Sequence, residues 1–213
     1  MTVHSIIDKL CNPQLKELIT MAGRPREFDD QQVIDAAMDA FWRDGYEATS
    51  AQALVESTGL GRGSLYAAFG NKEKLYHEAL RRYHQNSIDF HQEIFARSGS
   101  VAERLRLLLQ KGTEIDLSNV ERNGCMAIFS PLERSAKDAT VDRLSRHYIK
   151  QLEQMFALLF AQGITSGEFP ADRDASVMAK SFMCGYFGFR VFGRIVHEAD
   201  YQQQAIDALL RTI

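Results

Sequence analysis

The sequence has little cysteine or proline, with three cysteines and four prolines among 213 residues. Cys11, Cys125 and Cys184 are far apart, odd in number and outside any CxxC pair, which argues against a disulfide framework and a zinc ribbon. Few prolines and no strand-like alternation predict an all-α protein. No apolar run approaches the roughly 20 residues of a membrane-spanning helix, and no basic segment followed by an apolar one opens the chain. We therefore expect no membrane partner, no secretory signal and a cytoplasmic location.

The chain also lacks a strong excess of charge of either sign. Its formal net charge is −3, with 45% hydrophobic and 25% charged residues. This composition is ordinary for a globular protein that buries a core. The total charge gives no hint of a nucleic-acid partner, although a local basic patch is compatible with it. No nucleophile–base motif occurs, so we expect no catalytic residue, no cofactor and no enzymatic activity.

Metal-ligand spacing is lacking as well. His77, His84 and His91 recur every seven residues, and on one helix this separates neighbours by about 10 Å, too far for two of them to share an ion. The chain has neither the ExxH pair of a di-iron bundle nor the HxxxH pair of a zinc site. We predict no metal site, and we expect these histidines at the surface or in an interface.

What the sequence does contain is helical periodicity. Gly45 is expected to end the first helix as a left-handed cap, and Thr49, with Gln52 three residues later, has capping-box spacing for the second. Asn71 would cap a fourth, long helix. Three short helices followed by a long one are therefore predicted before residue 100. The expected segments are Asp30–Gly45, Thr49–Thr58, residues 62–69 and a helix from Asn71 to about Arg97.

The remaining residues predict longer helices. A short apolar segment opens after Gly124 and is expected to be broken by Pro131. The last two helices are expected at about Asp174–His197 and near Gln202–Arg211. Residues 1–21 have two interpretations that stay open, a short helical extension or the product of an upstream start site. The predicted organisation is this extension, an N-terminal domain at residues 22–80 and a C-terminal domain at residues 81–213.

Three alternating glycines lie in the stretch GLGRGSLYAAFGN, residues 59–71. A phosphate-binding loop would need GxxxxGK[ST] after a strand, and a dinucleotide fingerprint would need GxGxxG between a strand and a helix. Here the pattern is GxGxG, it follows a helix, and no GK[ST] occurs. The glycines therefore favour a turn between two helices.

Two short helices joined by a tight glycine-containing turn are typical of a helix-turn-helix. Residues 49–58 would be the supporting helix, residues 59–61 the turn and residues 62–69 the recognition helix. Small side chains at Gly63 and Ser64 would let the recognition helix sit deep in a major groove. Basic residues surround it, and a short basic arm precedes the first helix. These residues are Arg24 and Arg26 in the arm, and Arg62, Lys72, Lys74, Arg81 and Arg82 within residues 60–82.

Residues 23–80 resemble the N-terminal domain of the TetR/AcrR family of transcriptional regulators. The resemblance rests on GRPREFD, FWRDGYEATS, GLGRGSLYAAF and NKEKL, in that order, and more weakly on NGCMAIFSPLE, which is similar to a G-C-x-x-x-N-[ST]-x-x-E segment of one branch. It implies an all-α homodimer in which a long helix joins the helix-turn-helix domain to a helical ligand-binding domain. It also implies a repressor that binds a palindromic operator in double-stranded DNA and is released by a small-molecule inducer.

The resemblance also implies roles for individual residues. Thr49 matches a threonine that contacts a phosphate and caps the supporting helix, Tyr66 a tyrosine that contacts the DNA backbone, and Lys72 a lysine on another phosphate. Arginine that donates two hydrogen bonds to guanine is the commonest specific pairing, so Arg62 is the main candidate for sequence readout. Gly61 departs from the family, which often has a capping serine there. The predicted DNA-binding residues are Arg24, Arg26, Thr49, Ser50, Gly61, Arg62, Gly63, Ser64, Tyr66, Lys72 and Lys74.

The resemblance implies an inducer pocket inside the C-terminal helices, and the aromatic and sulfur-containing side chains there suggest an apolar or aromatic ligand. Cys125, directly after Gly124 at an expected helix start, leaves two interpretations open: a thiol sensor of oxidants or electrophiles, or a small apolar core residue. The candidate pocket residues are Phe90, Cys125, Met126, Phe129, Tyr148, Met155, Phe156, Met183 and Tyr186.

The segment MCGYFGFRVFG interleaves small and aromatic side chains. The resemblance implies that the last two helices form a four-helix bundle with those of a second copy. The segment supports this, because small residues permit close helix approach while aromatic residues bury large areas. A buried helix within one chain would give the same pattern. A helical carrier or enzyme with a vestigial DNA-binding domain stays open as a different class of function. The candidate dimer residues are Cys184, Gly185, Gly188, Phe189, Phe192, Ile206, Leu209 and Leu210.

Overall fold

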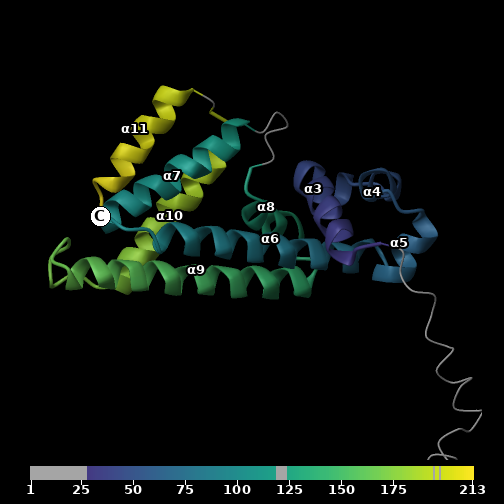
Figure 1. The fold of residues 1–213 in the computed structure, drawn as a ribbon, viewed down its shortest axis with the longest axis horizontal. Helices are drawn as coiled ribbons and strands as arrows, with labels where there is room; N and C mark the ends of the chain where they lie inside the picture. Colours follow the sequence, from purple (N-terminus) through teal and green to yellow (C-terminus); the bar gives the residue numbers. More distant parts are fainter. Residues whose placement is uncertain (1–27, 119–123, 194, 197) are drawn as a thin grey trace, which may run out of the picture. The chain divides into compact units, whose positions relative to one another are not determined.

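The computed structural model describes residues 28–118, 124–193, 195–196 and 198–213. Within these residues it has nine α-helices and no strand, so the predicted all-α class is confirmed (Figure 1). Residues 1–33 and 34–213 form two compact units, and the contacts described below belong to the second. The helices are α3 (Asp30–Ala48), α4 (Ala51–Thr58), α5 (Arg62–Phe69), α6 (Lys72–Phe95), α7 (Val101–Ser118), α8 (Met126–Arg134), α9 (Ala139–Thr165), α10 (Ala175–Phe192) and α11 (Ala199–Leu210).

The helix-turn-helix segments lie close to their predicted positions. Gly59, with φ 69° and ψ 5°, is the left-handed C-cap of α4, a conformation that glycine adopts without strain. Asn71 caps α6 as predicted, because its side chain accepts the N–H of Lys74. Two predicted caps are wrong. Ser50, not Thr49, caps α4 by accepting the N–H of Ala53, and Gly45 does not end α3, which continues to Ala48.

Gly45 interrupts α3 without terminating it. Its φ of 78° and ψ of 173° lie outside both helical regions, and a positive φ of this kind favours glycine. One further helical turn follows through Ala48. The pattern of apolar residues does not distinguish a break inside the helix from a left-handed cap at its end. Both place a glycine at positive φ, and they differ only in the ψ angle of that glycine.

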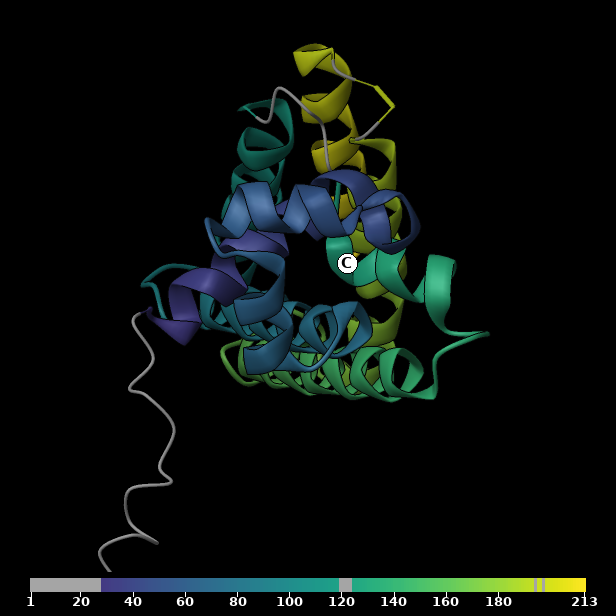
Figure 2. The same ribbon diagram turned by 90° about the vertical axis from the view of Figure 1, so that its right-hand side faces the viewer.

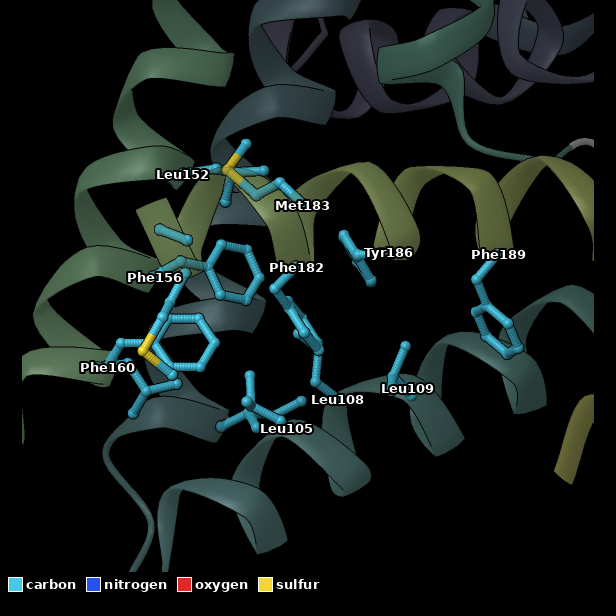
Figure 3. Packing of buried hydrophobic residues seen from close by; sticks show 14 of the residues in the cluster. Leu105, Leu108, Leu109, Leu152, Phe156, Phe160, Phe182, Met183, Tyr186 and Phe189 are labelled. Atoms are coloured by element: carbon cyan, nitrogen blue, oxygen red, sulfur yellow. The ribbon is translucent and has the colours of Figure 1, made fainter. Parts of the chain in front are cut away.

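The C-terminal helices pack around the second half of α6. The long helices α6 and α9 run beside each other, and α10 packs against α9 and also contacts α7 and α11 (Figures 1 and 2). Figure 3 shows the centre of this core, where Phe156 and Phe160 of α9 meet Phe182 of α10 at ring-centroid distances of 5.3 and 5.9 Å. Each such ring removes a large apolar area from water, so these contacts contribute much of the packing energy of this region.

Two predicted helix ends are wrong. Pro131 lies inside α8, which continues to Arg134. A proline removes one backbone donor, and here the remaining bonds of the short helix, including Ser135 N to Pro131 O at 3.0 Å, are kept. At the other end of the chain, α10 stops at Phe192, short of the predicted His197, which lies outside the described residues.

The expectation that the histidines lie at the surface or in an interface is wrong for His84 and His91. His84 and His91 are 7% and 1% exposed, inside the packed face of α6, and His77 is half-buried. The reason is helical spacing, since positions 77, 84 and 91 lie on the same stripe as buried Leu80 and Ile88. A seven-residue repeat next to apolar residues at i+3 and i+4 marks a core stripe, whatever the residue type.

Residues 1–27, which hold the predicted extension and the basic arm of Arg24 and Arg26, lie outside the described residues. The predicted domain boundary at residue 80 stays a prediction, and it falls within α6. Among the residues described, no helix combines the length and the apolar character needed to cross a membrane.

Candidate nucleic-acid interface and ligand cavity

Helix α5 has one buried side and one exposed side. Leu65 is fully buried, as is Leu54 of α4, and these two leucines anchor the helix pair to the core. Arg62, Gly63 and Ser64 are exposed at the start of α5. The predicted recognition residues therefore lie on a solvent-facing surface that a duplex can reach.

The basic residues near α5 differ in their surroundings. The Arg62 guanidinium lies 6.0 Å from the centre of the Tyr66 ring, and Lys74 is exposed. The Lys72 ammonium lies 4.4 Å from the Tyr46 ring centre. Burial lowers the pKa of Lys72, while the carboxylates of Glu47 and Glu133 oppose part of that shift. Lys72 is therefore partly committed to a cation–π contact.

Arg81 and Arg82, the other members of the basic set, form ion pairs with acidic residues. Arg81 Nη1 lies 2.6 Å from Glu78 Oε1. Arg82 makes a two-pronged pair with Asp35, at 2.7 Å from Nε and 3.1 Å from Nη2. Their charges are therefore balanced locally.

Thr49 is placed differently from its prediction. Its side chain is fully buried, and its hydroxyl donates to the Gly45 carbonyl at 2.5 Å. A buried hydroxyl engaged with its own backbone does not reach a phosphate, so the predicted phosphate contact of Thr49 is wrong for this conformation. Thr49 instead holds the turn between α3 and α4. Its neighbour Ser50 is exposed and supplies the cap.

Two adjacent residues of α8 hold the end of α3. The Glu133 carboxylate accepts the N–H groups of Tyr46 and Glu47 at 3.0 and 2.9 Å, directly after the break at Gly45. The Arg134 guanidinium lies 4.0 Å from the Tyr46 ring centre, and its Nη1 lies 2.9 Å from Glu47 Oε1. We call these contacts the α8 clamp. Sequence reasoning missed the clamp, because its partners are 86 to 88 positions apart and no local pattern relates them.

The clamp extends into a network of charges. Arg134 also lies 3.4 Å from Glu73 and 3.7 Å from Asp138, and His77 Nε2 lies 2.7 Å from Asp138 Oδ2. Burial alone would raise the pKa of Asp138, but hydrogen bonds from His77 and two backbone amides outweigh it and hold that pKa below its usual value. Glu73, His77 and Asp138 place ligand atoms within 4.8 Å of one another. Because Arg134 already balances both carboxylates, the arrangement is an ion-pair network.

A cavity of about 190 Å³ lies between α3, α6, α9 and α10, next to the start of α8. Tyr83 and Tyr148 line it with their hydroxyls engaged: Tyr83 donates to Cys125 Sγ at 3.7 Å, and Tyr148 shares a 2.8 Å hydrogen bond with Ser87. Burial raises the pKa of both tyrosines, so they stay neutral. The residues that line the cavity are Met38, Trp42, Tyr83, Asn86, Ser87, Phe90, His91, Ile115, Cys125, Tyr148, Tyr186 and Arg190.

The structure brings together four of the nine predicted pocket residues, namely Phe90, Cys125, Tyr148 and Tyr186. The other five lie elsewhere. Met126 and Phe129 line a separate pocket of about 390 Å³ between α3 and α8, and Met155 lines a groove between α6 and α9. Phe156 and Met183 belong to the packed core (Figure 3). All nine residues were predicted from their residue type. Whether such a side chain points into a cavity depends on the rotation of its helix about its axis.

A larger groove of about 760 Å³ lies between α8, α9 and α10, and none of the predicted pocket residues line it. Its wall includes Leu132, which is 76% exposed. The smaller cavity has the features of a ligand site, because half of its lining residues are buried and several carry polar groups that can orient a ligand.

The predicted dimer residues also separate into two groups. Phe189 and Ile206 are 7% and 2% exposed in the core of their own chain, so their assignment to an interface is wrong. A Cβ added at Gly185 would lie 2.4 Å from Leu209 Cδ1, so these two residues pack against each other within one chain, and Leu210 is half-buried against the same core. The remaining residues, Cys184, Gly188 and Phe192, lie on the outer side of α10, where Cys184 and Phe192 are exposed.

Gly61 occupies the N-cap of α5 with φ −60° and ψ 147°, and no side-chain oxygen caps the helix. A Cβ there would meet nothing within 4 Å. Gly61→Ser is therefore expected to stabilise the protein by a few tenths of a kcal/mol, about 1 °C in Tm, because the hydroxyl accepts a free N–H of the first turn. Gly61→Ala is the matched control and should destabilise, since alanine adds the Cβ without an acceptor. Thermal unfolding measures both, and a lower Tm for Gly61→Ser would contradict the expectation.

Comparison with known proteins agrees with this geometry. Residues 33–79 match the family model described as bacterial regulatory proteins, tetR family. The chain is 30% identical over 195 residues to the uncharacterized HTH-type transcriptional regulator YezE of Bacillus subtilis (strain 168), covering 90% of this chain and 99% of that protein. It is 32% identical over 175 residues to the HTH-type transcriptional repressor ComR of Escherichia coli (strain K12), covering 81% and 82%.

A similar solved structure is a cysteine mutant of the TetR family transcriptional regulator CifR complexed with 26bp double-strand operator DNA. Its TM-score is 0.78 at 28% identity, and the match covers 89% of this chain and 98% of that chain. The likeness extends over both the helix-turn-helix and the C-terminal helices. The chain belongs to the TetR/AcrR family of transcriptional regulators.

Proposed function

We propose that the protein is a cytoplasmic repressor that binds a palindromic operator as a homodimer and is released by a small apolar or aromatic inducer. The observation that carries this proposal is the exposed start of α5, where Arg62, Gly63 and Ser64 are presented beyond the buried anchor Leu65. ComR is named a repressor, and CifR was solved on operator DNA, which supports the same role here.

In this proposal the contacts divide into two classes. Arg62 reads a base edge in the major groove, with Gly63 and Ser64 giving clearance. Tyr66, Lys72 and Lys74, together with exposed Ser50 at the start of α4, lie along the phosphate backbone and fix the orientation of α5. Arg24 and Arg26 add a basic arm. Thr49 is left out of the contact set, because its side chain is buried.

Selection of bound DNA from random sequence tests this function. We expect a two-fold symmetric sequence, bound with an affinity that falls steeply as salt rises, because lysine and arginine side chains displace counterions from the phosphates. Binding without sequence preference and without salt dependence would contradict the proposal. That result would favour a helical carrier or enzyme that has kept a vestigial DNA-binding domain.

The outer side of α10 is the proposed dimer surface. Val177 and Phe192 are 60% and 52% exposed at its two ends, and small or open positions at Cys184 and Gly188 lie between them. Gly188 has an ordinary helical backbone inside α10, and an added Cβ would meet nothing within 4 Å. Glycine inside a helix costs about 0.5–1 kcal/mol relative to alanine. Because none of the described residues requires glycine there, close approach of a second α10 accounts for it.

Gly188→Arg is therefore expected to dissociate the dimer. The side chain has space in the single chain, but in a close helix pair it buries an unpaired charge, so the dimer dissociation constant should rise by at least about a hundredfold. Light scattering after size-exclusion chromatography measures the mass. Leu158→Arg, at a 66% exposed position of α9, is the matched control and should stay dimeric. A dimeric Gly188→Arg variant would place the interface elsewhere.

Helix α8 is the proposed connection between ligand and DNA. Cys125, the N-cap of α8, lines the cavity, and Glu133 and Arg134 at the other end hold Tyr46 and Glu47. A ligand that displaces the first turn of α8 therefore moves the support of α3. Cys125 is only 6% exposed, which favours a wall residue over a thiol that meets oxidants in solvent.

A further inference from the structure

We propose that the cavity between α3, α6, α9 and α10 binds a neutral single-ring compound that carries a hydroxyl group, and that His91 accepts the hydrogen bond from that hydroxyl. This inference rests on the proposed function in one respect, namely that the cavity is the inducer site. It adds the chemical class of the ligand and the residue that selects it.

The protonation of His91 follows from its hydrogen bond. His91 Nδ1 lies 2.6 Å from the carbonyl oxygen of Ser87, one turn earlier in α6. A carbonyl oxygen only accepts, so Nδ1 carries the proton, and in a neutral ring Nε2 is then a bare acceptor. Burial lowers the pKa of His91 to about 4, so the ring is neutral at physiological pH.

Nε2 of His91 is buried and has no hydrogen-bond partner among the described residues. The side chain is 1% exposed and lines the cavity. A buried acceptor without a donor is costly, and the cavity is where a donor can be supplied. Nε2 is therefore available to accept a hydrogen bond from a donor on a bound ligand.

The surroundings of His91 are aromatic. The rings of Phe90, Phe95, Phe156 and Tyr186 stand edge-on to its imidazole, at centroid distances of 5.6 to 5.9 Å. An apolar cavity of about 150 Å³ holds one benzene ring, so the 190 Å³ here suits one substituted ring. Of these rings, those of Phe90 and Tyr186 also line the cavity, and together with an imidazole acceptor they fit a phenol-class compound.

Charge distinguishes this ligand from a carboxylate of the same size. The lone pair on His91 Nε2 repels an anionic oxygen and attracts a hydroxyl hydrogen. Arg190 also lines the cavity and carries a positive charge, so a carboxylate is the competing class. A hydroxyl ligand needs a hydrogen-bond acceptor at His91 Nε2, whereas a carboxylate ligand needs a donor there. The relative affinities of the two ligand classes therefore test the inference.

The chain has a single tryptophan, Trp42, and it lines the cavity. We therefore follow Trp42 fluorescence during titration with 4-methylphenol, 1,4-dimethylbenzene and 4-methylbenzoate, which share ring size and differ in polar group. We expect saturable binding of 4-methylphenol, at least about tenfold tighter than either comparison compound, equivalent to about 1.4 kcal/mol. Equal binding of 1,4-dimethylbenzene, tighter binding of 4-methylbenzoate, or no saturable change with any probe would overturn the inference.

Two matched variants test whether His91 causes the preference for 4-methylphenol. His91→Phe keeps an aromatic ring and removes the acceptor, so it should lower the affinity for 4-methylphenol about tenfold to that of 1,4-dimethylbenzene. His84→Phe is the control, because His84 is also buried in α6 with a Nε2 that has no partner among the described residues, yet it does not line the cavity. It should retain the preference. Since Trp42 also borders the pocket between α3 and α8, a preference that survives His91→Phe would place the ligand there and overturn the inference.

These titrations use the full chain without DNA, so they stand apart from the test of the proposed function. Failure to bind an operator would contradict the repressor role and leave the phenol preference measurable. A phenol preference without any change in operator affinity would keep the ligand class and remove only the inducer role of the cavity.

Discussion

Acidification from about pH 7.5 to about pH 5 is expected to destabilise the fold by about 4 kcal/mol, because two buried histidines resist protonation. Burial lowers the pKa of His84 and of His91 to about 4, against 6.5 for the free side chain. Each pKa unit corresponds to about 1.4 kcal/mol, so each histidine contributes about 2 kcal/mol at about pH 5. A loss of this size is a large part of the stability of an ordinary domain.

The direction of the effect follows from proton uptake. The unfolded chain protonates these histidines below about pH 6.5, while the folded chain binds those protons only near pH 4, so stability is complete above 6.5 and is lost as the pH falls between the two values. The charged groups that face the rings reinforce the shift. His147 of α9 lowers the pKa of His84, and Arg190 of α10 lowers that of His91, where the bond to Ser87 opposes part of it.

Urea unfolding at several pH values measures this loss. The double variant with His84→Phe and His91→Phe should lose most of the pH dependence, and each single variant about half of it. His147→Gln, which removes an exposed histidine, should leave most of the dependence in place. If the double variant retained the full loss of stability, other groups would be responsible for it.

Arg62→Ala is expected to weaken specific operator binding by about 30-fold to about 10⁴-fold, because a two-pronged arginine–base contact provides about 1–3 kcal/mol and a dimer makes it twice. The stability of the protein should change little, since Arg62 is exposed and its recorded contact is a ring centroid 6.0 Å away. Fluorescence anisotropy with the selected operator and with unrelated DNA measures the two affinities.

The relative losses of affinity for the operator and for unrelated DNA distinguish base readout from sequence-independent electrostatic attraction. Arg62→Ala should reduce the preference for the operator, whereas Lys74→Ala, at an exposed phosphate-facing candidate, should weaken both DNAs alike and lower the salt dependence. Arg146→Ala, at an exposed position of α9, is the control for loss of a surface charge and should have no effect. A uniform loss for Arg62→Ala would make Arg62 a phosphate contact.

Local signals in the sequence predicted the DNA-binding elements well. The glycine pattern at residues 59–61 and the cap at Asn71 depend on neighbouring residues only, and both are in place. Where a local signal was ambiguous, it failed. Thr49 and Ser50 are both good cap residues, and only the burial of Thr49 decides between them.

Contacts between segments that are distant in the sequence could not be predicted from these local signals. The α8 clamp joins residues that only the complete fold brings together, and the cavity depends on the rotation of four helices about their axes. The same limit explains Phe189 and Ile206, whose residue types suit a dimer interface and the core of one chain equally well.

The α8 clamp has a consequence for protein engineering. Two backbone donors that follow Gly45 are satisfied by Glu133, so the DNA-binding helices are completed by a residue that lies outside residues 22–80. A chimera that joins these DNA-binding helices to the ligand domain of a relative therefore needs a carboxylate at the position that corresponds to Glu133 in the relative's own helix. Without this carboxylate, the N–H groups of Tyr46 and Glu47 lose their acceptor, and the chimera is less stable. Neither parent protein shows this defect, because it arises only when the two parts are combined.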